Sequence, residues 1–238
     1  MTASSIIKEQ FKHINSNFRE YLLIALPLIV AQVLLLQGTA LLNDLNIALY
    51  ATVIFSLIVI IYYYFRFAVN LHRLIILKEN SNYYSPLKHK KVTLFYFLCL
   101  FIYFMVIFVI IIAIGFLDAL LNANYLIWNW LFIIALGISA YIYSIYGFLL
   151  PEVAIGNKFS FKSSRLKSKG YRKILFYQFL IIYVPFWIAD RIIDMTVPET
   201  ANLAFNLIYS IISIYLLILF IGSLSRTYMI AKEQNERN

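Results

Sequence analysis

The stretch Tyr21–Leu42, YLLIALPLIVAQVLLLQGTALL, contains no charged side chain. A helix needs about 20 mostly apolar residues to cross a hydrocarbon core of about 30 Å, so this stretch is long enough to span a membrane. Five further runs are similarly long and mostly apolar: Asn46–Phe65, Thr93–Leu117, Leu126–Leu150, Ile174–Val197 and Leu203–Leu224. Asp190 and Arg191 lie near the outer end of Ile174–Val197, and in one interpretation that run ends as early as Ala189. Backbone groups in lipid must find hydrogen-bond partners within their own segment, which requires helices. The sequence therefore predicts an all-α polytopic membrane protein, a bundle of six transmembrane helices.

The twenty Lys and Arg residues are distributed unevenly around these runs. Nineteen of them fall in the segments that share one side of the membrane if six helices cross: 1–20, 66–92, 151–173 and 225–238. The connections on the other side hold only Arg191. Short cytoplasmic loops carry an excess of Lys and Arg. We therefore expect a multi-pass protein of a bacterial cytoplasmic (inner) membrane, with both termini in the cytoplasm.

The composition agrees with this class of protein. Of the 238 residues, 63% are hydrophobic and only 13% are charged. A soluble domain carries about a quarter charged residues, so a water-facing surface could not be covered here. The formal net charge of +9 would suggest a nucleic-acid partner in a soluble protein. Because the cations gather on one side, we expect the lipid bilayer and anionic headgroups at its cytoplasmic face as partners instead, and no nucleic acid.

Residues 1–20 precede the first run and have an amphipathic pattern. Apolar side chains recur there at helical spacing, opposite several basic ones: Ile7, Phe11, Ile14 and Phe18 against Lys8, Lys12 and His13. This pattern predicts a helix that lies in the membrane surface. A cytosolic helix packed on the basic loops is the alternative. The predicted organisation is thus an N-terminal amphipathic helix, a membrane domain over 21–224 and a cytoplasmic tail over 225–238.

Two segments next to the basic connections resemble a known group of proteins. These are Ala68–Glu79, AVNLHRLIILKE, and Leu149–Gly156, LLPEVAIG. They resemble segments of uncharacterised six-helix inner-membrane proteins common in alphaproteobacteria, and more distantly of YciC-like proteins and the membrane domain of some glycerophosphodiester phosphodiesterases. The chain departs from that pattern at Leu71, where Trp is frequent, and at Lys78. The resemblance implies a six-helix fold and carries no established activity.

The first of these segments contains three candidate site residues, His72, Arg73 and Glu79. His72 and Glu79 are seven positions apart and would share a face if the segment were helical. One interpretation is a polar cluster that contacts a lipid headgroup or a protein partner. The other is structural, with His72 at the membrane interface and Arg73 extending its charge to the headgroups.

The second basic connection supplies four further candidates for contact with lipid or a partner: Lys162, Arg165, Lys167 and Lys169. Each cation near an anionic membrane surface contributes about 1 kcal/mol of binding free energy. The connection is too short to form a separate soluble domain, so we expect these side chains to lie at the membrane surface.

No catalytic constellation is recognisable, and we predict no catalytic residues, no cofactor, no metal and no enzymatic activity. The three histidines lie on the cytoplasmic flank, and Ser139 in a deep apolar run has none beside it to act as a base. The leading hypothesis is a non-enzymatic envelope or accessory protein. A small carrier or channel for a neutral or amphipathic solute is the alternative, supported by Gln32, Gln37 and an expected kink at Pro185. A lipid-directed enzyme using His72 and Glu79 is a third possibility.

Overall fold

The computed structural model describes residues 2–40, 47–79, 90–121, 125–158, 160–196 and 203–237. Throughout these ranges the regular structure is helical, and they contain no strand. The predicted all-α class is therefore confirmed.

Six long helices coincide with the six apolar runs. They are α2 (Phe18–Ala40), α3 (Ile47–Leu77), α4 (Lys90–Leu121), α5 (Tyr125–Tyr146), α8 (Arg172–Thr196) and α9 (Leu203–Arg237). Among the side chains that the structure describes, one stretch, Ala204–Glu236 of α9, is long and apolar enough to cross a membrane. Helix α9 is thus one candidate spanning helix by length and composition, and the six-span arrangement stays a prediction.

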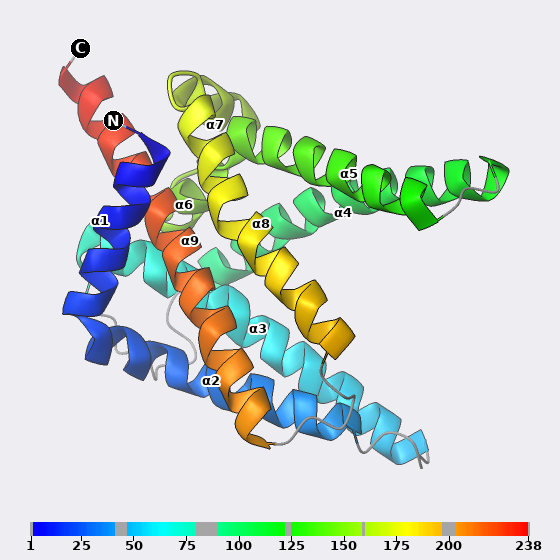
Figure 1. Cartoon of the computed structure of the whole chain (residues 1–238). Coiled ribbons are helices and arrows are strands. Elements are labelled where there is room, and N and C mark those ends of the chain that lie inside the picture. The colour runs from blue at the N-terminus through cyan, green and yellow to red at the C-terminus, as the bar shows by residue number, and fades with distance from the viewer. Residues whose placement is uncertain are drawn as a thin grey trace.

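The long helices form three antiparallel hairpins, α2–α3, α4–α5 and α8–α9. Figure 1 shows that the hairpins diverge from a common end of the molecule, at which both chain termini lie. We call this the inner end. Helix α9 is central, because it packs against α2, α3 and α8. The helix ends that border the basic connections therefore converge, as the alternating distribution of cations predicts.

Three short helices complete the inner end: α1 (Ala3–Ser16), α6 (Leu149–Ala154) and α7 (Phe161–Ser168). The first begins with a capping box, in which the side chains of Thr2 and Ser5 bond to each other's backbone N–H groups. The third begins at Ser160, whose hydroxyl accepts the backbone N–H of Ser163 at 3.2 Å. Local sequence thus determines where each of these two helices starts.

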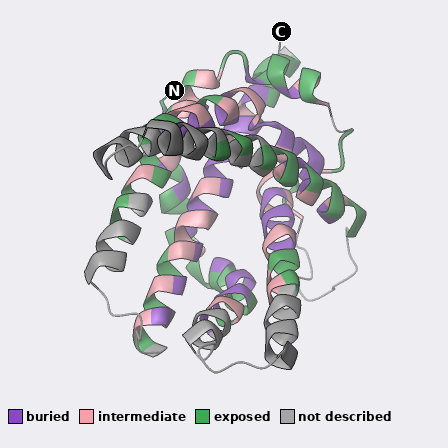
Figure 2. Ribbon diagram, turned by 90° about the vertical axis from the view of Figure 1, so that its right-hand side faces the viewer, coloured by how far each residue is buried: buried purple, intermediate pink, exposed green. Residues whose placement is uncertain are grey.

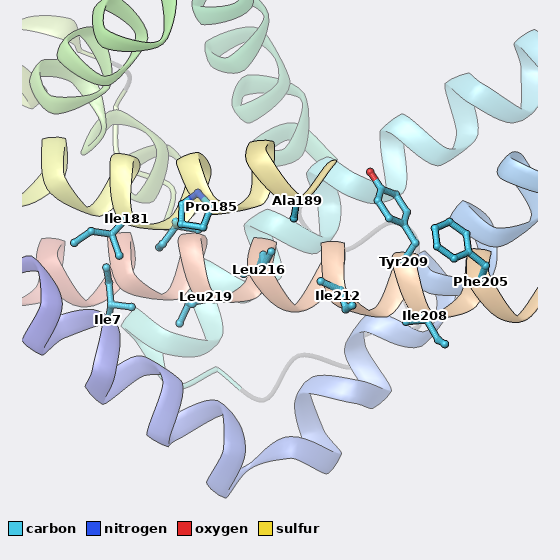
Figure 3. A pocket seen from close by; sticks show the side chains of 11 residues that line it. Ile7, Ile181, Pro185, Ala189, Phe205, Ile208, Tyr209, Ile212, Leu216 and Leu219 are labelled. Atoms are coloured by element: carbon cyan, nitrogen blue, oxygen red, sulfur yellow. The ribbon is translucent and has the colours of Figure 1, made fainter. Parts of the chain in front are cut away.

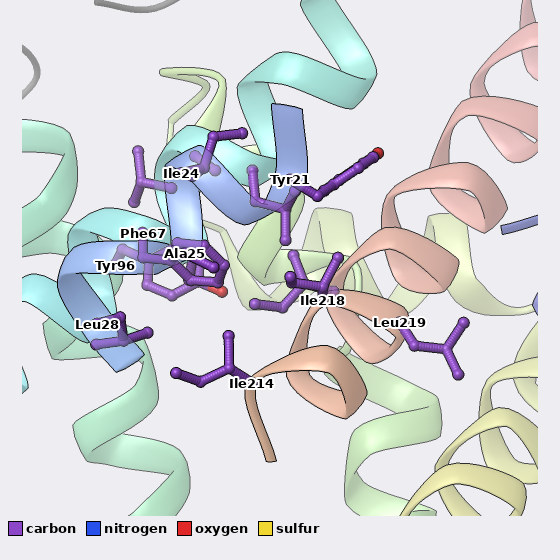
Figure 4. Packing of buried hydrophobic residues seen from close by; sticks show 14 of the residues in the cluster. Tyr21, Ile24, Ala25, Leu28, Phe67, Tyr96, Ile214, Ile218 and Leu219 are labelled. Atoms are coloured by element: carbon purple, nitrogen blue, oxygen red, sulfur yellow. The ribbon is translucent and has the colours of Figure 1, made fainter. Parts of the chain in front are cut away.

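The main core lies between α2, α3 and α9. Figure 4 shows Ala25 and Leu28 of α2 facing Ile214 and Ile218 of α9. A second cluster joins α5, α8 and α9 around the fully buried Phe148. In Figure 2, many of the buried residues lie toward the inner end, where the polar connections meet.

Helix α1 is amphipathic, and one side of it packs on the protein. Its buried residues are Ala3, Ile6, Gln10 and Ile14. Of the predicted apolar stripe, Phe11 and Phe18 are 48% and 50% exposed, and its placement in a membrane surface stays a prediction. Gln10 is fully buried and its Oε1 accepts Arg226 Nε of α9 at 2.5 Å. This bond, which apolar periodicity does not reveal, turns the helix so that it packs on α8 and α9 rather than on the basic loops.

The fourth apolar run is interrupted earlier than expected. Helix α5 ends at Tyr146 and α6 begins at Leu149, so the predicted single helix over 126–150 is wrong in its last turn. The interruption falls at Gly147, where a Cβ would lie 2.7 Å from the carbonyl oxygen of Tyr143. Pro151 does not break the helix, since it sits in the first turn of α6, where its missing N–H has no intrahelical partner to lose.

Candidate functional site

His72 is fully buried where α3, α4 and α9 meet. Its Nδ1 lies 2.7 Å from Ser225 Oγ, and its Nε2 lies 3.1 Å from the hydroxyl of Tyr96. Ser225 Oγ also donates to the carbonyl of Ile221 at 2.9 Å. All these groups are satisfied if Nδ1–H donates to Ser225 and Tyr96 donates to Nε2. Burial lowers the pKa of His72 to about 3, so the ring is neutral near pH 7.

This arrangement bears on two possible roles of His72, contact with a headgroup or partner and catalysis. The prediction that it contacts a headgroup or partner is wrong in this structure, because its side chain has no exposed surface. The Ser225–His72 pair is also no nucleophile and base, because the serine proton points to a backbone carbonyl and no substrate can reach it. His72 instead holds three long helices together.

Arg73 and Glu79 meet away from His72. Helix α3 ends at Leu77, and Lys78 adopts a left-handed conformation with φ of 52°. The chain turns back there, and Glu79 Oε2 accepts Arg73 Nε at 2.8 Å and Nη2 at 2.7 Å. The expected shared helix face of His72 and Glu79 is therefore wrong, because Glu79 lies beyond the end of the helix. Arg73 also donates to the carbonyl of Ala154 at 3.1 Å and so attaches α6 to α3.

An ion pair between a buried carboxylate and a partly exposed lysine joins α6 to α7. Glu152 is 1% exposed, and its Oε1 accepts the ammonium of Lys167. Sequence reasoning did not select Glu152, although a lone carboxylate in the apolar segment LLPEVA is the available signal. Buried carboxylates almost always have a partner.

Helix α7 lies across the end of α5. Its Ser164 and Ser168 are buried, and their hydroxyls donate to the carbonyls of Tyr146 and Ile145 at 3.2 and 2.6 Å. Since these serines are four positions apart, they occupy one face of α7 and satisfy two terminal carbonyls of α5. The basic residues alone do not indicate which face of α7 packs on the protein.

The opposite face of α7, which we call the α7 outer face, is exposed. It consists of Lys162, Arg165, Leu166 and Lys169, whereas Phe161 packs edge-on against Tyr146 of α5. Within the described part of the chain, the side chains of its three cations form no ion pair. Leu166 is 62% exposed between them. The structure thus brings three of the four predicted cations together and turns the fourth, Lys167, toward Glu152.

An apolar groove of about 420 Å³ runs between α8 and α9. Figure 3 shows Ile181, Pro185 and Ala189 of α8 facing the groove opposite α9. The lining from α9 consists of Phe205, Ile208, Tyr209, Ile212, Leu216 and Leu219. Ile7 of α1 lies at the inner end of the groove. Helix α8 continues through Pro185 to Thr196.

Gln32 and Gln37 are the two deep glutamines that support the carrier hypothesis, and the structure describes the side chain of only the first. Gln32 Oε1 accepts the hydroxyl of Tyr64 at 3.0 Å, which joins α2 to α3. Interhelical bonds of this kind contribute about 0.6 kcal/mol on average. The side chain of Gln37 lies outside the described part of the structure. Gln32 therefore has a packing role, and no path for a solute is defined by it.

No protein-family model matches the chain, and neither a curated protein nor a solved structure matches it. The resemblance carried by Ala68–Glu79 and Leu149–Gly156 therefore stays a prediction. Function has to be argued from the geometry of the inner end.

Proposed function

We propose that this chain is a non-enzymatic accessory protein of a bacterial cytoplasmic membrane, whose α7 outer face binds anionic lipid headgroups. The observation that carries this proposal is the division of α7 into two faces. One face bonds to the end of α5 through Ser164 and Ser168. The other presents three cations together with the exposed Leu166.

The membrane placement is supported by α9 and by the inner end. Helix α9 has the length and apolar composition of a spanning helix. The ends of the long helices that border basic connections lie together, at the same end as both termini. If six helices cross, the inner end faces the cytoplasm and α7 lies at the level of the headgroups.

The chemistry of the α7 outer face favours a lipid surface over water or nucleic acid. Lys162, Arg165 and Lys169 would each contribute about 1 kcal/mol near an anionic surface. Leu166 is 62% exposed between them, and such a side chain inserts at the boundary between headgroups and acyl chains. A face that only bound phosphate groups would gain nothing from this apolar side chain.

The test compares two variants that lose the same formal charge. In Lys162→Gln/Arg165→Gln/Lys169→Gln the α7 outer face is neutralised. In Lys90→Gln/Lys91→Gln/Lys232→Gln three other exposed cations are removed. Both proteins are purified in a mild detergent, and the anionic phospholipid retained per protein is quantified by mass spectrometry.

We expect the α7 variant to lose more than half of the retained anionic lipid and the control to stay near the unmodified protein. Lys167 is left in place, because its charge is engaged with Glu152. Equal losses in the two variants would indicate a general effect of charge and would contradict the proposal. Unchanged retention in the α7 variant, with correct insertion, would contradict it as well.

A further inference from the structure

We infer that the groove between α8 and α9 holds one acyl chain of an anionic phospholipid, whose phosphate lies beside Lys8 and Lys12 of α1. This inference rests on the proposed function in placing the inner end at the headgroup level. It concerns a separate surface, because the lining of the groove includes no residue of α7.

The length of the groove fits an acyl chain. Phe205 and Leu219 mark its two ends on α9. These residues are fourteen positions apart, which corresponds to about 21 Å along a helix. One leaflet of the hydrocarbon core is about 15 Å thick, so a single chain extending from the inner surface is accommodated. The volume of about 420 Å³ lies within the range of ligand pockets.

The surface of the groove selects a hydrocarbon occupant. Ile181, Ile208 and Ile212 line it and are 44%, 58% and 52% exposed. Apart from the hydroxyl of Tyr209, the lining side chains carry no polar group. A polar solute would lose hydration here without gaining hydrogen bonds, whereas a hydrocarbon chain loses none.

The charge next to the inner end of the groove selects an anionic headgroup. Ile7, which closes the groove, and Phe11 are one helical turn apart on α1. Phe11 also borders a surface hollow lined by Lys8 and Lys12, so these two cations lie within two helical turns of Ile7 on α1. Glu9 borders the hollow too, but its carboxylate lies 4.0 Å from Arg226 and is partly neutralised. Two ammonium groups therefore remain for a phosphate.

The test places the full-length protein in vesicles that contain phosphatidylglycerol with a diazirine in its acyl chain. After irradiation, mass spectrometry maps the residues that carry lipid. We expect adducts on the groove side of α8 and α9, over 181–189 and 205–219. Adducts spread evenly over other exposed apolar residues, such as Leu94 and Val109 of α4, would overturn the inference.

Two neighbouring substitutions separate the groove from the surrounding surface. Ala189→Trp fills the groove and should lower these adducts about tenfold. Ile188→Trp changes the adjacent, 47% exposed residue, which does not line the groove, and should preserve them. Equal labelling of the two variants would overturn the inference. If Ala189→Trp does not fold, the adduct map of the unmodified protein is the deciding test.

A second arm tests the headgroup and separates this inference from the proposed function. Phosphatidylcholine with the same diazirine should give fewer groove adducts, and Lys8→Gln/Lys12→Gln should remove that difference. Equal labelling by both lipids in the unmodified protein would overturn the anionic assignment. The Lys162→Gln/Arg165→Gln/Lys169→Gln variant should keep its groove adducts. Their loss in that variant would mean that one surface accounts for both observations, and the separate site would be rejected.

Discussion

His72 Nδ1 and Ser225 Oγ lie 2.7 Å apart, although the two residues are separated by 153 positions in the chain. Their hydrogen bond joins α3 to α9, and the bond between His72 and Tyr96 adds α4. A neutral histidine with no exposed surface therefore holds three long helices together at the inner end. The stability of this junction depends on the protonation state of the ring.

Acidification should destabilise the protein through His72. The unfolded chain binds a proton below the ordinary pKa of 6.5, whereas burial keeps the folded pKa at about 3. Between these values the unfolded state holds more protons, so lowering the pH reduces the free energy of unfolding by up to about 1.4 kcal/mol per pH unit. We expect the Tm in detergent to fall from pH 7 to pH 5.

The variant His72→Gln should have a lower Tm at pH 7 and a weaker decline toward pH 5. His13→Gln is the comparison, because His13 is exposed on α1 and its ring meets Tyr21 of α2 edge-on. Burial and the nearby Arg226 also lower the pKa of His13, and this variant should remove a smaller part of the decline. If the unmodified protein and His72→Gln lost stability in parallel between these pH values, the decline would have to come from other groups.

The contact between α1 and α9 depends on Gly222. A Cβ at this position would lie 2.2 Å from Nε2 and 2.9 Å from Cγ of Gln10. We expect Gly222→Ala to displace α1 and to reduce stability by about 1–3 kcal/mol. The measurement is limited proteolysis at Lys8 and Lys12, which should become faster.

Two further variants make this prediction specific. Adding Gln10→Ala to Gly222→Ala should restore the resistance of α1 to protease, because it removes the atoms that clash. Gly137→Ala is the matched control, since a Cβ there meets nothing within 4 Å. Faster cleavage in the control, or no rescue in the double variant, would contradict the proposed contact.

The long helices were largely predictable, because an apolar run of about 20 residues has few alternatives in a membrane. The first run gives α2 over Phe18–Ala40 and the last gives α9 over Leu203–Arg237. What failed was the detail at helix ends and faces. Glu79 lies past the end of α3 because Lys78 takes a left-handed conformation, which the sequence does not signal.

The candidate site was predictable in composition and not in arrangement. Basic residues near 162–169 were selected by charge, but charge alone does not reveal that Lys167 faces a buried Glu152. Gln10 was overlooked because hydrophobic periodicity gives no weight to a polar residue whose partner, Arg226, lies more than two hundred positions away. Such pairs depend on tertiary structure.

The Glu152–Lys167 pair should respond asymmetrically to substitution. Lys167→Met leaves a carboxylate that is 1% exposed without its partner and should cost about 1–3 kcal/mol of stability. Glu152→Gln/Lys167→Met should regain part of that loss, because no buried charge remains. A double-mutant cycle in thermal or denaturant unfolding measures the coupling, and purely additive losses would show that the pair is not coupled.

Arg66 is a buried cation whose removal should stabilise the protein, in contrast to Lys167. It is 5% exposed, its Nη1 has no hydrogen-bond partner, and it forms no ion pair within the described part of the chain. The desolvation of an unpaired buried charge is not compensated, so replacement by an apolar residue of similar length should be stabilising. We therefore expect Arg66→Met to raise the Tm in detergent.

Arg73→Met is the control and should lower the Tm, because it removes the bonds to Glu79 and Ala154. A lower Tm for Arg66→Met would mean that an anion compensates this guanidinium in the folded protein.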